Sequence, residues 1–182
     1  MKLRIIAACG ILCLFCTVTN VVFAQRQRRM ESLGPSNPQI TGRLRHTVEV
    51  GTKGEYFHRL GTPLTIKDGR GRGTLTAVIG VRYPTADALG QVVFFWHNKT
   101  FNSMSADYET PAVVSLKSPA AGTFVIRYAR YKKTDPMCCP TLHPRAVTYG
   151  WSGHILISNG VPPKGPGHLV KVKYESRLAS SG

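Results

Sequence analysis

Acidic residues are scarce in this sequence. Nine Asp and Glu residues stand against 24 Lys and Arg residues among 182, so the formal net charge is +15. A surface of this sign concentrates anions near it, and nucleic acid is a common partner of such basic chains. We nevertheless expect no nucleic acid, because the chain begins with an export signal and its basic residues are not interleaved with aromatic residues as in a base-stacking groove.

Recognisable catalytic motifs are also missing. The six histidines are dispersed without His-x-x-x-His spacing, and there is no Gly-x-Ser-x-Gly segment. The few carboxylates are scattered, so no acid–base pair can be assigned from the sequence. We therefore expect a protein that is not an enzyme and that needs no cofactor. An enzyme whose residues meet only in the folded chain remains an alternative.

The first 24 residues have the pattern of an export signal. Lys2 and Arg4 give a positive start, residues 5–23 are almost wholly apolar and uncharged, and the run ends at Ala24 before a polar residue. This order is typical of a cleaved secretory signal peptide. There are two alternatives: an uncleaved anchor, since about 20 apolar residues can span a bilayer, and acylation of Cys9, which follows two alanines.

The rest of the chain fits one domain. We divide the sequence into a signal peptide (residues 1–24), a flexible basic leader (25–46) and a single mainly-β domain (47–182). Cleavage would leave 158 residues with a charge of +13, because Lys2 and Arg4 are lost and all nine acidic residues stay. This length suffices for a sizeable core. No second long apolar run follows, so we expect a periplasmic or extracellular protein, with any membrane tether at its N-terminus.

Hydrophobic periodicity predicts strands and no long amphipathic helix. Residues 75–83 alternate as in a half-buried strand, whereas residues 91–97 are apolar on both faces as in a central strand. Residues 51–64 are punctuated by Gly and Pro and are predicted to be irregular. The other predicted strands are 46–50, 111–116, 123–131, 146–151, 154–158 and 169–174, with Ser152-Gly153 as a two-residue turn. We expect a single antiparallel sheet or a sandwich-like domain, with a short N-terminal helix covering one face.

Only two cysteines, Cys138 and Cys139, follow the signal segment. This number excludes the disulfide framework of small secreted domains. Adjacent Cα atoms lie about 3.8 Å apart, below the ~4.4–6.8 Å usual for a disulfide, so a bridge between these residues would be strained and easily reduced. In an oxidising compartment we still expect this bridge. Pro136 and Pro140 bracket the pair and predict a rigid turn.

The same turn offers soft metal ligands. Met137, Cys138, Cys139 and His143 lie within seven residues, and thiolate and thioether suit Cu(I) whereas imidazole suits zinc or copper. Structural zinc sites and thiol-redox enzymes both use cysteines separated by other residues. A metal-binding or thiol-redox protein is therefore the alternative to a turn that is only structural.

Four basic residues lie around the predicted turn: Arg127, Arg130, Lys132 and Lys133. Outside the cytoplasm the abundant polyanions are lipid head groups and anionic envelope polymers. We regard these residues as candidates for contacting such anions. A solvated basic surface that affects only solubility is the alternative.

The arrangement of these segments resembles a known family. A strand ending in residues 127–131, the Cys-Cys-Pro segment 135–141 and a strand ending in residues 149–153 resemble the LppP/LprE-type family of bacterial envelope lipoproteins. The resemblance covers roughly residues 65–158, including the Gly-rich segment 68–74. It implies an exported protein without an assigned biochemical activity. This chain departs from the family pattern at Cys9, which lacks a clear lipobox, and at Arg70 and Arg72, where relatives tend to be acidic.

Overall fold

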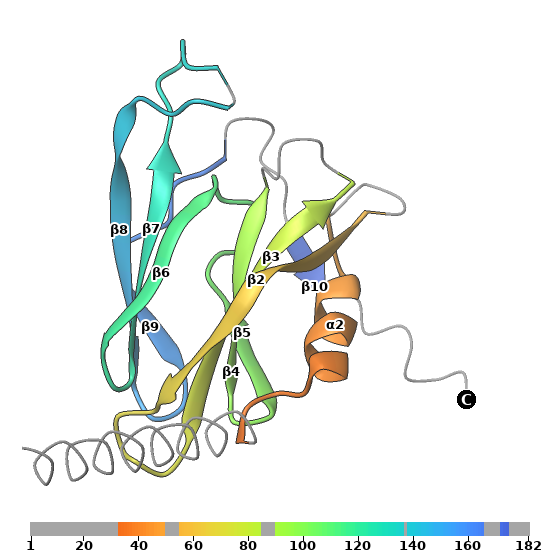
Figure 1. Cartoon of the computed structure of the whole chain (residues 1–182), viewed down its shortest axis with the longest axis vertical. Helices are drawn as coiled ribbons and strands as arrows, with labels where there is room; N and C mark the ends of the chain where they lie inside the picture. Colours follow the sequence, from red (N-terminus) through yellow and green to blue (C-terminus); the bar gives the residue numbers. More distant parts are fainter. Residues whose placement is uncertain (1–32, 50–54, 85–89, 137, 166–171, 175–182) are drawn as a thin grey trace, which may run out of the picture.

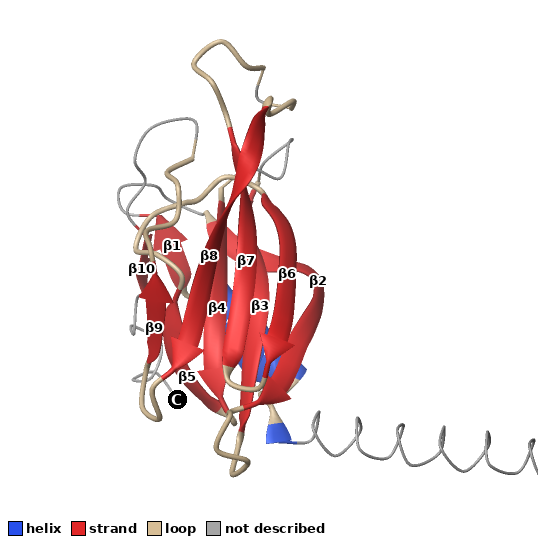
Figure 2. Ribbon diagram, turned by 90° about the vertical axis from the view of Figure 1, so that its left-hand side faces the viewer, coloured by secondary structure: helices blue, strands red, loops and turns tan. Residues whose placement is uncertain are grey.

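The structure is a computed structural model that describes residues 33–49, 55–84, 90–136, 138–165 and 172–174 (Figures 1 and 2). These described residues form one helix and ten strands: α2 (Asn37–Arg45), β1 (Thr47–Glu49), β2 (Tyr56–Lys67), β3 (Thr74–Tyr83), β4 (Gln91–His97), β5 (Thr100–Met104), β6 (Val113–Ala120), β7 (Thr123–Arg130), β8 (Leu142–Trp151), β9 (Leu156–Asn159) and β10 (Val172–Tyr174). The predicted mainly-β class is confirmed. Among these residues no helix has the length and apolar character needed to cross a membrane.

Two four-stranded antiparallel sheets face each other. One has the order β2-β3-β4-β5 and the other the order β6-β7-β8-β9, while β1 and β10 form a separate two-stranded sheet. Figure 1 shows the two larger sheets as neighbouring layers, and Figure 2 looks onto the second sheet with the first sheet behind it. Of the two architectures expected from the sequence, the sandwich is therefore the one that the structure has.

The core explains why the 91–97 segment is apolar on both faces. In a strand, successive side chains point to opposite faces. Val93 and Phe95 of β4 pack toward the second sheet, where Phe124, Ile126 and Tyr149 complete the main core. The alternate residues of β4 belong to a second core cluster on the other face of the sheet. The prediction of a central strand covered on both faces is confirmed.

Helix α2 covers the outer face of the first sheet. Ser36 caps its N-terminus, since its Oγ accepts from the Gln39 N–H and the Gln39 side chain accepts from the Ser36 N–H. Ile40 and Leu44 are buried in the second core cluster. Gly80 of β3 makes room for the helix, because a Cβ there would lie 2.7 Å from Leu44 Cδ2. The expected N-terminal helix is confirmed, and it leaves β3 buried on both faces, so the prediction of a half-buried strand is wrong.

Three local predictions also need correction. Residues 51–64 were expected to be irregular, but from Tyr56 onward they belong to β2, where a register shift between Leu60 and Leu64 absorbs Gly61 and the intervening residues. Strand β5 was not predicted at all. The β8–β9 hairpin is confirmed, but Trp151 pairs with Leu156, so its turn spans four residues instead of two.

Candidate functional site

The two cysteines lie in the loop between β7 and β8, at the upper end of the sandwich in Figure 1. Both side chains are exposed. His143 is exposed near the start of β8, and Met137 lies outside the described residues. The described residues include no group of three or more His, Cys, Asp or Glu side chains that could hold a metal ion. The disulfide and the metal set both stay predictions.

Asp135 closes the base of this loop. Its carboxylate accepts hydrogen bonds from the backbone N–H of Lys132 at 2.8 Å and from the backbone N–H of Thr141 at 2.9 Å. The Thr141 hydroxyl donates to the same carboxylate at 2.8 Å. The hydrogen bonds from Thr141 and then Lys132 lower the pKa of Asp135 below its ordinary value. Because the two donors lie on either side of the cysteines, one ionised side chain ties both arms of the loop together.

The segment inside this clamp is further constrained. The Cys139 N–H donates to the Pro136 carbonyl at 3.0 Å, which closes a turn around the first cysteine. Pro136 and Pro140 fix the backbone φ on both sides of the pair. The predicted rigid turn thus has a physical basis, although the clamping role of Asp135 was not anticipated. Its signal in the sequence was an Asp before the first proline and a Thr after the second.

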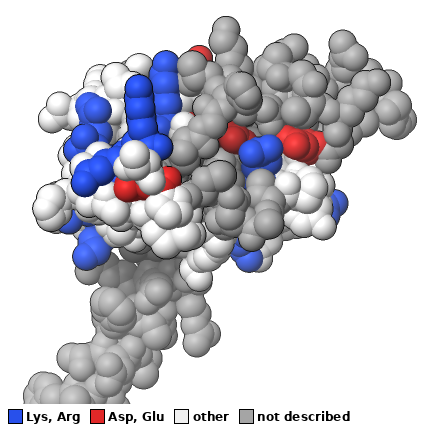
Figure 3. All heavy atoms as spheres, turned by 90° about the horizontal axis from the view of Figure 1, so that it is seen from above, with Lys and Arg blue, Asp and Glu red and all other residues white. Residues whose placement is uncertain are grey.

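A groove beside the loop is lined by cations. We call it the end groove, and its charged lining residues are Arg130, Lys132, Lys133 and Lys164. Its volume is about 320 Å³, its remaining walls are mostly apolar, and no Asp or Glu is among the described residues that line it. Figure 3 looks onto this end and shows Lys and Arg side chains gathered on one side of it.

Lys164 reaches the end groove from a distant part of the chain. Its Nζ lies 5.8 Å from the centre of the Tyr108 ring, over the ring face. The Tyr108 hydroxyl donates to the Pro162 carbonyl at 2.7 Å, and the Gly165 N–H donates to the Glu109 carbonyl at 3.1 Å. These contacts fix the segment that carries Lys164. Lys164 was not among the predicted anion contacts, because it lies 31 positions after Lys133 in the sequence.

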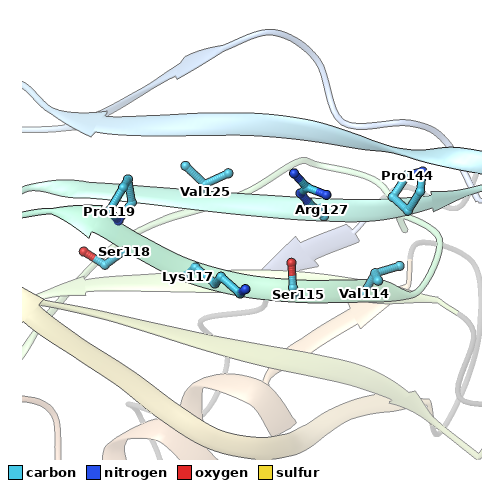
Figure 4. Close-up of a pocket in the computed structure, with 8 residues that line it drawn as sticks. All are labelled: Val114, Ser115, Lys117, Ser118, Pro119, Val125, Arg127 and Pro144. Atoms are coloured by element: carbon cyan, nitrogen blue, oxygen red, sulfur yellow. The ribbon is translucent and has the colours of Figure 1, made fainter.

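Arg127 lies apart from the other three candidates. It points from β7 into a shallow groove of about 510 Å³ on the outer face of the second sheet, which we call the face groove. Figure 4 shows this groove running along β6, β7 and the start of β8. Lys117 is the other cation that lines it. The structure thus brings Arg130, Lys132 and Lys133 together and separates Arg127 from them.

A buried carboxylate occupies the opposite end of the sandwich. Asp68 is only 4% exposed, and its Oδ2 lies 3.3 Å from His97 Nε2. The His97 ring stacks on Trp151 of the second sheet at a centroid distance of 4.6 Å. Burial raises the pKa of Asp68, but hydrogen bonds from His97 and from the N–H groups of Arg70 and Arg72 outweigh it and lower the pKa overall. This cluster joins the two sheets.

Comparison with known protein families supports the family resemblance seen in the sequence. The model of the family described as LppP/LprE lipoprotein matches residues 70–154. This segment belongs to the LppP/LprE lipoprotein family. The match indicates an exported, membrane-associated envelope protein. No curated protein and no solved structure matches the chain.

The LppP/LprE match covers only part of the features described above. It includes the Cys-Cys loop, the Asp135 clamp and three cations of the end groove. It excludes α2, all of β2 and Lys164. The family segment therefore carries the loop and most of the groove, and the flanking residues complete the first sheet and the groove wall.

Proposed function

We propose that this protein is a non-catalytic envelope protein that binds anionic envelope polymers or lipid head groups through its end groove. The observation that supports the proposal is the convergence of Arg130, Lys132, Lys133 and Lys164 on one groove whose described lining residues include no Asp or Glu. All four side chains are exposed, so an anion can reach them without a change in the fold. The proposed compartment is periplasmic or extracellular.

The strength of such binding follows from simple electrostatics. Each Lys or Arg near an anionic membrane surface contributes about 1 kcal/mol, so four cations supply up to about 4 kcal/mol. Exposed charges are screened beyond ~8–10 Å at physiological ionic strength. We therefore expect weak binding that salt abolishes, with the apolar walls of the groove adding contacts to the uncharged parts of a polymer or head group.

Vesicle sedimentation tests the proposal. The protein should sediment with vesicles of phosphatidylglycerol and phosphatidylcholine at low salt, but not with pure phosphatidylcholine vesicles or at 0.5 M salt. Replacing Lys132 and Lys133 by Gln should weaken binding about tenfold or more, given about 1 kcal/mol for each charge. The matched control removes two exposed cations, Arg72 and Lys99, from the opposite end.

The two double variants separate a groove from a general charge effect. Both lower the net charge by the same amount, so equal losses in binding would mean that total charge decides, and the proposed groove would be wrong. Binding that persists at 0.5 M salt would also contradict the proposal. Soluble lipopolysaccharide fragments and anionic wall polymer in place of vesicles show which source of anionic groups the groove prefers.

A further inference from the structure

The Cys138–Cys139 pair is presented to solvent by a loop whose base is fixed. The Asp135 carboxylate ties the two arms of the loop together through Lys132 and Thr141. Both cysteine side chains are exposed, and none of the hydrogen bonds described for this loop uses a cysteine sulfur. The anion-binding proposal leaves these two side chains without a role. An exposed pair of neighbouring sulfurs on a constrained loop is a chemical feature that needs its own explanation.

We propose that Cys138 and Cys139, in their reduced form, bind one soft metal ion of low coordination number, with Cu(I) as the representative. Thiolate sulfur is a soft ligand that selects Cu(I) over hard cations. Neighbouring Cα atoms lie about 3.8 Å apart, so the two thiols are close enough for both to bind a single ion. The pair supplies two ligands, fewer than the four of a structural zinc site.

The surroundings of the loop suit a site with a net negative charge. The thiolate is the form of cysteine that binds metals. Lys132 and Lys133 are exposed and lie within three residues of Asp135, whose carboxylate already accepts three hydrogen bonds. A site of two thiolates and one Cu(I) carries one net negative charge, which these lysines offset.

The binding step balances without an oxidant. Two S–H bonds break and give two protons to the buffer, two S–Cu bonds form, and copper remains Cu(I) throughout. Since binding releases protons, the affinity should rise with pH until both thiols are ionised. A disulfide between the two cysteines removes both ligands, so the oxidised protein should not bind the ion.

Competition with a coloured Cu(I) chelator tests this site. The reduced protein, kept without oxygen, is titrated into the Cu(I) complex of bicinchoninate, and loss of colour reports transfer. We expect one Cu(I) per chain for the unmodified protein and none for the variant in which both cysteines are Ser. Either single Ser variant should bind at least tenfold more weakly, and Asp135→Asn about tenfold more weakly because it loosens the support of the ligands. Asp107→Asn, an exposed acid elsewhere, should bind as the unmodified protein does.

Several outcomes would overturn the proposal. They are no transfer to the reduced protein, full affinity in either single Ser variant, or half an equivalent of Cu(I) with chain dimerisation, which indicates a site shared by two molecules. Circular dichroism of each variant shows whether the fold is kept. Vesicle binding of the same samples is a separate readout, so failure of the end groove and failure of the metal site are distinguishable.

Discussion

The buried carboxylate of Asp68 should contribute strongly to stability, and Asp68→Asn measures that contribution. The carboxylate accepts from the Arg70 N–H at 3.0 Å and contacts His97 Nε2 at 3.3 Å. Hydrogen bonds to a charged group contribute about 1.5–3 kcal/mol each. The Asn side chain keeps one acceptor oxygen, so we expect a net loss of about 2–3 kcal/mol in the free energy of unfolding. For a domain of this size that loss lowers the midpoint of thermal unfolding by about 4–12 °C.

The loss of stability caused by Asp68→Asn should become smaller as the pH falls. The pKa of Asp68 is lowered in the folded protein, so its stabilising contribution is present above the unfolded-state value of about 3.9 and is lost as the pH falls through the lower folded value. The unmodified protein and the Asn variant should therefore differ most near pH 7. Their unfolding free energies should begin to converge below about pH 4 and become similar once the pH is below the lowered pKa of Asp68.

Urea unfolding followed by tryptophan fluorescence is the assay. Asp107→Asn is the matched control, because Asp107 is exposed and its replacement should change stability by less than about 0.5 kcal/mol. The reasoning would be refuted by an Asp68→Asn variant within about 0.5 kcal/mol of the unmodified protein at neutral pH. A difference that persists unchanged at low pH would show that the ionised form of the carboxylate is not what stabilises the fold.

Two further substitutions test the packing of each sheet. Gly80→Ala should destabilise the protein by about 1–3 kcal/mol, because its Cβ would lie 2.6 Å from the Phe94 ring. The control Gly42→Ala should not destabilise the protein, because no atom lies within 4 Å of the new Cβ. The midpoints of urea unfolding measure both effects. Tyr149→Phe should cost about 1–3 kcal/mol, since it leaves the buried Tyr128 hydroxyl without its 3.1 Å partner. Burial raises the pKa of Tyr149, so Tyr149 should not ionise before the protein unfolds. Absorbance at alkaline pH should therefore show one tyrosine more ionising before unfolding in this variant than in a variant with an exposed tyrosine replaced.

The parts of the fold that the sequence predicted are those governed by local patterns. Residues 91–97 are apolar on both faces because β4 lies between two cores. The prediction failed for β2, where Gly61 and Pro63 resemble loop residues but are absorbed by a register shift. Pairing with β3 overrides the local preference of these residues, and that pairing is not visible in the sequence of β2 alone.

In the candidate site, too, the sequence predicted the local features and missed those that depend on contacts between distant segments. The Cys-Cys turn was predictable because its two prolines lie next to it in the chain. The end groove was only partly predictable, because Lys164 joins Lys132 and Lys133 through contacts between distant loops. The Asp68–His97 pair joins residues 29 apart across the first sheet, and this proximity requires knowledge of which strands are neighbours. Arg127, although close in sequence to the groove cations, points to a different face.

The most direct test of the anion-binding proposal is to map where an anion binds. Isotope-labelled protein is titrated with a soluble short-chain phosphatidylglycerol, and the amide chemical shifts of each residue are followed. The account predicts that the changes concentrate at residues 130–133 and 164–165, and that they disappear at 0.5 M salt. Changes confined to the face groove around Arg127, changes spread evenly over the surface, or no changes at all would contradict it.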